Sequence, residues 1–139
     1  VIECVLDGSK NKFIVSDMWR NEENLKSLWS IDTYVGVKNE TWLANIYYCK
    51  NVITDSFHGL CFAIIFNKPF IVLQNKLRGN DRFLSLLKLL NLEYRLLSED
   101  ASESQIKEVM NKTIDWNEVN SIIEHEKYHS MKWLKECIN

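Results

Sequence analysis

Residues 51–95 read NVITDSFHGLCFAIIFNKPFIVLQNKLRGNDRFLSLLKLLNLEYR, and this stretch decides the fold. Its first apolar run, residues 52–54, predicts a short strand, and the longer run at 60–66 predicts a buried helix. The NKP sequence at 67–69 ends that helix, and residues 70–73 predict a second buried strand. A strand, a helix and a strand in this order predict a right-handed βαβ unit with two parallel strands.

The polar turn between the first strand and the helix is the candidate site, because ligands of open α/β sheets bind at the carboxyl ends of strands. One interpretation is purely structural: Asp55 or Ser56 caps the helix, Gly59 relaxes the turn and His58 is incidental. A second makes Ser56 a nucleophile with His58 as its base. Residues two apart on a tight turn seldom present both groups to one atom, and the G-x-S-x-G pattern is absent, so this interpretation is disfavoured.

The third interpretation is anion binding combined with acid–base chemistry. The free N–H groups and the positive end of a helix attract a phosphate or carboxylate. An imidazole beside such an anion can donate or accept a proton near neutral pH, which makes His58 the candidate catalytic residue.

Composition places few constraints on function. The chain has 139 residues, of which 46% are hydrophobic and 26% charged, and we expect one α/β domain spanning residues 1–139. A net charge of -2 gives no support for a nucleic-acid partner. The chain starts at Val1 inside an apolar run, so we expect a piece of a longer protein.

The four cysteines are scattered and form no CxxC pair, which predicts reduced residues and no disulfide. Cys49 and Cys61 lie in apolar runs and are expected in the core. We therefore expect a cytoplasmic protein, with peripheral association with the inner face of the membrane left open. No apolar run reaches the roughly 18 residues that a membrane span needs.

Upstream of the central stretch the pattern is less regular. Residues 1–6 are expected to end a helix, 12–16 predict a strand, and 25–29 have helical spacing. Residues 34–37 are a strand or an extended segment. A clearer helix begins near Thr41, with Asn39 or Thr41 as its cap.

Downstream, three helices are predicted. The first is capped by Asn80 or Asp81 and ends at Asn91. The C-terminal helices occupy residues 101–137, and Asp115 caps the last of them. The apolar positions of this last helix are Val119, Ile122, Ile123, Trp133 and Leu134.

The segment VITDSFHGLCFAIIFNKPFIVL, residues 52–73, resembles the C-terminal motif of the polysaccharide pyruvyl transferase family. The similarity continues through NDRF at 80–83 and LEYR at 92–95, and TWLA at 41–44 resembles the Trp-Leu helix that precedes the motif. It covers roughly residues 41–97. The resemblance rests on the combination of these segments.

This resemblance implies a transferase that moves a pyruvyl group from phosphoenolpyruvate to a sugar of a surface polysaccharide, forming a ketal. The acceptor would be a saccharide or a lipid-linked saccharide, with no cofactor and no metal. The implied architecture is a Rossmann-like parallel sheet flanked by helices, similar to the C-terminal half of the two-domain glycosyltransferase B fold. The active site would lie between the halves, so residues 1–139 alone are expected to be inactive without the missing N-terminal domain.

The resemblance makes His58 the general acid. It places the substrate contacts at Ser56, Phe57, Gly59, Arg78, Asn80 and Arg82. Some relatives have Arg-Leu-His where this chain has Ser-Phe-His, and this departure removes one cation from the donor site. Bidentate arginines suit a phosphate or carboxylate, so Arg78 or Arg82 is the expected substitute, with Arg82 preferred. Arg95 matches a family position, but a packing role is expected for it.

Two other functions remain open: a nucleotide-sugar-binding C-terminal domain of a glycosyltransferase, and a non-catalytic sugar- or phosphate-binding module. The loop at 74–81 has no aromatic residue to stack on a purine, which disfavours the nucleotide. His125 and His129 have a metal-chelating spacing on the last helix. Charged neighbours and the lack of a third ligand favour a solvated face, so no metal site is predicted.

Overall fold

The computed structural model describes residues 2–6, 12–17, 32–35, 38–74 and 80–138. It is an α/β fold, as predicted from the sequence, with one six-stranded sheet in the order β3-β2-β1-β4-β5-β6. The strands are β1 (Ile2–Leu6), β2 (Lys12–Asp17), β3 (Asp32–Val35), β4 (Asn51–Thr54), β5 (Phe70–Leu73) and β6 (Leu96–Leu97). The helices are α1 (Asn39–Tyr48), α2 (Phe57–Ile65), α3 (Asp81–Leu89), the 3-10 turn η2 (Glu93–Arg95), α4 (Glu103–Asn111) and α5 (Trp116–Ile138).

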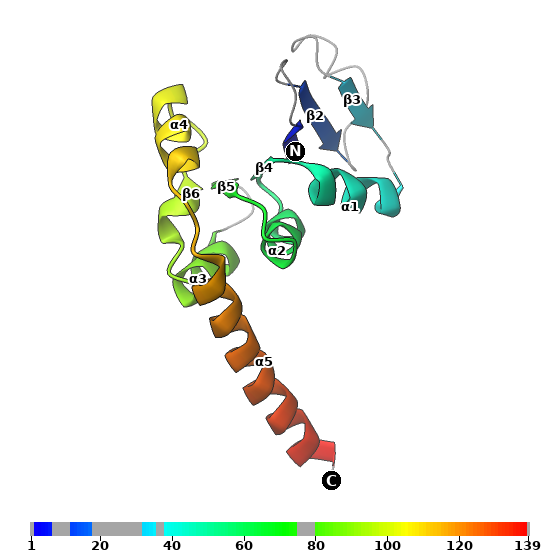
Figure 1. Cartoon of the computed structure of the whole chain (residues 1–139), viewed down its shortest axis with the longest axis vertical. Helices are drawn as coiled ribbons and strands as arrows, with labels where there is room; N and C mark the ends of the chain where they lie inside the picture. Colours follow the sequence, from blue (N-terminus) through cyan, green and yellow to red (C-terminus); the bar gives the residue numbers. More distant parts are fainter. Residues whose placement is uncertain (1, 7–11, 18–31, 36–37, 75–79, 139) are drawn as a thin grey trace.

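The central βαβ unit is confirmed. β4 and β5 are parallel with Val52 opposite Phe70, and β5 is parallel to β6 with Val72 opposite Leu96. These three parallel strands and their helices give the Rossmann-like character of the fold. Their carboxyl ends lie at one edge of the sheet, and α2 starts there, directly after β4 (Figure 1).

β1 corrects the sequence interpretation of residues 1–6 as a helix end. It is a strand, antiparallel to both β2 and β4, with Glu3 opposite Val15 on one side and Ile53 on the other. A short apolar run fits a buried strand and a buried helix equally well, because periodicity cannot separate them over so few residues. Since β2 is parallel to β3, β1 alone runs against the other five strands of the sheet.

The core lies on one face of the parallel strands. Val52, Phe70 and Val72 point to that face and pack with apolar residues of the helices: Trp42, Ile46, Leu60, Ala63, Ile64, Phe83, Leu87, Leu90 and Val119. Because successive side chains of a strand alternate, Ile71 points to the opposite face, where it is fully buried. α4 contacts β5 and buries its Val109, so helices pack against the sheet on both faces.

α2 and α3 each end on an asparagine in the left-handed conformation. Asn67 has φ 52° and Asn91 has φ 57°. The N–H of Lys68 donates to the carbonyl oxygen of Ala63 at 2.8 Å, and that of Leu92 donates to Leu87 at 2.8 Å. These are the closing bonds of Schellman motifs, in which asparagine tolerates the conformation that glycine usually adopts. The predicted helix stop at Asn91 is therefore confirmed.

The predicted helix starts are only partly right. Asp115 caps α5, because its Oδ1 accepts from the N–H groups of Asn117 at 3.0 Å and Glu118 at 3.2 Å. The predicted cap of α1 is wrong: its N-cap residue is Lys38, which makes no side-chain cap. Asn80 occupies the N-cap position of α3 without a side-chain cap bond. The helical spacing predicted at 25–29 lies outside the described residues.

α5 corrects a second expectation. Its first turns pack on the core through Val119, Ile122 and Ile123, but every described residue from Glu124 onward is exposed. Trp133 and Leu134, predicted on the buried face, are 65% and 43% exposed. Figure 1 shows the orange and red part of α5 running away from the other elements. Among the described residues, no helix has the length and apolar character needed to cross a membrane.

Candidate functional site

The turn between β4 and α2 is built by two hydroxyl side chains. Thr54 is fully buried at the end of β4, and its Oγ1 accepts from the N–H of Ser56 at 3.0 Å. Ser56 is the N-cap of α2, and its Oγ accepts from the N–H of Gly59 at 3.4 Å. The capping role of Ser56 is therefore confirmed, and the buried Gly59 supplies the N–H that the cap requires.

The first turn of α2 keeps two backbone donors available. The first N–H groups of a helix have no intrahelical acceptor. Within the described part of the chain, those of Ser56 and Gly59 have acceptors in the turn, whereas those of Phe57 and His58 have none. Together with the positive end of the helix, these two amides form a place where an anion can bind.

His58 is exposed at the second position of α2. It is therefore not a packed core histidine, and its side chain is accessible from solvent. Among the described residues, no hydrogen bond joins Ser56 to His58, and the Oγ of Ser56 is engaged with Gly59. The arrangement offers an imidazole beside two amide donors, without an activated serine.

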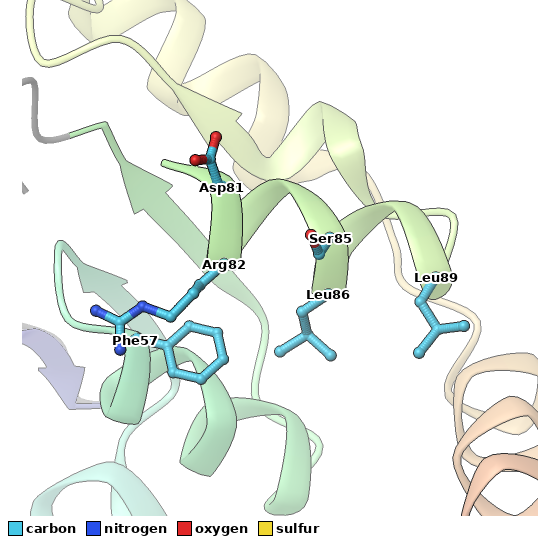
Figure 2. Close-up of a pocket in the computed structure, with 6 residues that line it drawn as sticks. All are labelled: Phe57, Asp81, Arg82, Ser85, Leu86 and Leu89. Carbon is cyan, nitrogen blue, oxygen red and sulfur yellow. The ribbon is translucent and has the colours of Figure 1, made fainter. Parts of the chain in front are cut away.

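Arg82 lies against the start of α2. Its guanidinium carbon is 5.2 Å from the ring centroid of Phe57, a cation–π distance. Phe57 in turn meets Phe83 edge-on, with ring centroids 5.8 Å apart. Figure 2 shows Arg82 extending from α3 towards Phe57, while Asp81 points the other way. The predicted contacts Phe57 and Arg82 are thus brought together, although 25 positions separate them in the sequence.

A pocket of about 430 Å³ adjoins this pair. The residues that line it, drawn in Figure 2, are Phe57, Asp81, Arg82, Ser85, Leu86 and Leu89. His58 is not among them, so the pocket lies beside the turn and is not centred on the imidazole. The sequence interpretation missed Ser85 and Leu89 as lining residues. Ser85 and Leu89 follow Arg82 by three and seven positions. This spacing places all three residues on one side of the helix, and it was the available signal that they line the same surface.

The other predicted contacts are not brought to this place. Arg78 lies outside the described residues. Asn80 is half-buried at the start of α3, and it does not line the pocket. The roles of both residues stay predictions.

Arg95 has the packing role expected for it. It is fully buried, and its guanidinium donates to the carbonyl oxygen of Phe70 at 3.2 Å and to that of Lys112. The side chain therefore links the turn η2 to β5 and to the end of α4, away from the candidate site.

Cys49 and Cys61 do not provide a nucleophile. Burial raises the pKa of the Cys49 thiol to about 11, an effect that the charge of Lys68 partly opposes. Burial also raises the pKa of the half-buried Cys61. Both are therefore thiols near neutral pH, whereas the nucleophilic form is the thiolate. Cys49, Cys61 and Cys137 are free; Cys49 is buried as expected, Cys61 is half-buried and Cys137 is exposed.

Comparison with known proteins relates one segment of the chain to a family. Residues 40–76 match the model of a family described as polysaccharide pyruvyl transferase. The matched segment starts in α1 and includes β4, the Ser56–Gly59 turn, α2 and β5. No curated protein and no solved structure matches the chain. The family is one of transferases, which act on a donor and a sugar acceptor. The match covers about a quarter of the chain, and it shows that residues 40–76 are similar to the polysaccharide pyruvyl transferase family, as the sequence resemblance suggested.

Proposed function

We propose that this chain takes part in transferring a pyruvyl group from phosphoenolpyruvate to a sugar of a polysaccharide, with His58 as the general acid. The single observation that carries the proposal is the placement of His58. It is exposed in the first turn of α2, where two amides have no acceptor among the described residues, and it lies inside the segment that matches the family. A site for phosphoenolpyruvate needs anion donors and a proton source, and this turn has both.

His58 would protonate the methylene carbon of phosphoenolpyruvate, which turns that carbon into a methyl group and makes the adjacent carbon electrophilic. A sugar hydroxyl then forms a bond to that carbon, and phosphate leaves. A second hydroxyl of the same sugar attacks in turn and closes the ketal. One hydroxyl proton restores His58, and the other goes to the released phosphate or to water. General acid–base catalysis of this kind typically contributes about 10²–10⁴-fold to a rate.

Arg82 would hold the anionic donor. Some relatives have an arginine two positions before the histidine and therefore have a cation at that place. This chain has Ser56 there, and its hydroxyl caps the helix. Arg82 approaches the same turn from α3 through its contact with Phe57. A guanidinium binds a phosphate or carboxylate with two parallel hydrogen bonds, so Arg82 can replace the missing cation.

The acceptor is proposed to be a saccharide or a lipid-linked saccharide, and further substrate contacts are proposed to come from another domain of the same protein. The test is phosphate release by the full-length protein, given phosphoenolpyruvate and a panel of saccharides, with mass spectrometry of the product. We expect phosphate and a saccharide heavier by one pyruvyl ketal. Phosphate release without a modified saccharide, or turnover of nucleotide sugars instead, would contradict the proposal.

A further inference from the structure

The exposed part of α5 has a second cluster of functional groups, far along the chain from the Ser56–Gly59 turn. His125 and His129 are one helical turn apart, and their Nε2 atoms face each other at 3.1 Å. The ring centroids are 4.4 Å apart. Residues 125–129 read His-Glu-Lys-Tyr-His, which fits the His-Glu-x-x-His pattern that presents two histidines to one metal ion from one helix face.

The hydrogen bonds of the pair indicate which nitrogen atoms are available. The Nδ1 of His125 lies 3.3 Å from the Oε1 of Glu126, and a carboxylate can only accept, so Nδ1 carries the proton. The Nε2 of a neutral His125 is then a lone-pair acceptor, to which the Nε2–H of His129 donates. A metal ion can take the place of this shared hydrogen, with His129 carrying its proton on Nδ1 instead.

The spacing of the two Nε2 atoms fits a chelated ion. Two ligands about 2.0–2.1 Å from a metal are about 2.9 Å apart at a right angle and about 3.3 Å apart at the tetrahedral angle. The observed separation of 3.1 Å lies between these values. The contact of Glu126 with Nδ1 also has the arrangement of a carboxylate that orients a metal-bound histidine from behind.

We propose that His125 and His129 form a two-histidine chelating site for one divalent transition-metal ion of the Cu²⁺, Ni²⁺ and Zn²⁺ class, with Glu126 as a positioning residue. Imidazole ligands suit these ions, and the order of affinities is Cu²⁺ over Ni²⁺ and Zn²⁺. The remaining coordination positions are open to water. Among the described residues no group of three or more ligands gathers, and Glu126 is turned to His125, so the site binds metal without the third ligand of a hydrolytic centre.

Isothermal titration of the full-length protein with nickel chloride tests this assignment. The titration is done in a Cys137→Ser background, because Cys137 is an exposed thiol on the same helix. We expect one ion per chain. His125→Gln and His129→Gln should each weaken binding at least about tenfold, since a chelate then becomes a single ligand. Glu126→Gln should weaken it about tenfold, the lower limit for a residue that orients a ligand.

The matched control exchanges two neighbours, combining His129→Ser with Ser130→His. It keeps the composition of the chain and all three of its histidines, but it moves the second imidazole off the shared helix face. This variant should bind nickel as weakly as His129→Gln, and circular dichroism should show the same helix content. Nickel binding by the exchanged variant as tight as by the parent protein would overturn the proposal. The proposal would also be overturned if His125→Gln bound nickel as tightly as the parent protein. The same holds if only His58→Gln abolished nickel binding.

Discussion

The guanidinium of Arg82 lies over the ring of Phe57, at 5.2 Å from the ring centroid to the guanidinium carbon. This contact joins α3 to the first residue of α2, next to the two amides available to an anion. An arginine held on an aromatic face loses less freedom when it binds an anion than a freely moving one does. The contact therefore restrains the guanidinium of Arg82 beside the start of α2, where the proposed function needs a cation.

Arg82→Gln should weaken binding of phosphoenolpyruvate. Hydrogen bonds to charged groups contribute about 1.5–3 kcal/mol, so we expect the KM for this donor to rise by about tenfold to a hundredfold. Lys88→Gln is the matched control, because it removes one exposed cation from the same helix outside the pocket. Steady-state kinetics of the full-length protein with both variants provide the measurement. Equal KM values for the two variants would remove Arg82 from the donor site.

His58→Asn should separate catalysis from stability. The substitution removes the imidazole, and with it the proposed proton donor, from an exposed position, so kcat should fall by about 10²–10⁴-fold. The free energy of unfolding should change by less than about 0.5 kcal/mol, as is usual for surface substitutions. Kinetics and thermal melts on one preparation test both statements. A variant with full activity would exclude His58 as the general acid.

Arg95→Gln, unlike His58→Asn, should destabilise the protein. Arg95 is fully buried and donates to the carbonyl groups of Phe70 and Lys112. A shorter side chain leaves those acceptors unsatisfied, and each such group costs about 1–3 kcal/mol. Urea denaturation should show a loss of roughly 2–4 kcal/mol, against less than about 1 kcal/mol for the exposed Arg82→Gln. Similar losses for the two variants would mean that Arg95 has no special structural role.

Cys49 should make the stability of the protein sensitive to alkaline pH. Burial raises its pKa in the folded chain from an ordinary value of 9.0 to about 11. Below pH 9 the Cys49 thiol is protonated in both the folded and the unfolded chain, and the free energy of unfolding has its full value. Between pH 9 and 11 the unfolded chain loses the proton first, so the free energy of unfolding falls by at most about 1.4 kcal/mol per pH unit.

The measurement for this prediction is urea denaturation of the parent protein and of Cys49→Ala from pH 8 to 11. Lysines and tyrosines titrate in the same range in both proteins, so the difference between the two curves isolates Cys49. The difference in the free energy of unfolding between the parent protein and Cys49→Ala should become smaller as the pH rises above 9. A constant gap would show that the Cys49 thiol ionises equally in both states.

The central part of the fold could be predicted because local signals and tertiary structure agree there. Each signal depends on only a few neighbouring residues. The signals are the turn residues at 67–69, the lengths of the apolar runs that form α2 and β5, and the left-handed conformation of Asn91. β1 could not be predicted in the same way. Its five residues match a helix end as well as a strand, and its state depends on pairing with β2 and β4.

The local geometry of the candidate site was predictable only in part, and the roles of its residues stay predictions. The turn residues and Arg82 follow from the residue pattern and the family resemblance, but the pocket depends on how α3 packs against α2, which no local pattern encodes. The apolar Trp133 and Leu134 were misplaced because a helical stripe predicts which residues share a face and not whether anything covers that face. The spacing of His125 and His129 was visible in the sequence, but the distance between their ring nitrogens and the contact of Glu126 with His125 are seen only in the structure.

The reversed strand β1 has a consequence for biosynthesis. A ribosome completes β1 and β2 before it reaches β4, and the antiparallel pair can form as soon as both have emerged. The other edge of β1, which β4 occupies in the finished sheet, then stays open until the chain has grown through α1. An open strand edge is a template for pairing with another chain. Newly made molecules are therefore most prone to aggregate in this interval, and slowing translation between β2 and β4 should increase the insoluble fraction.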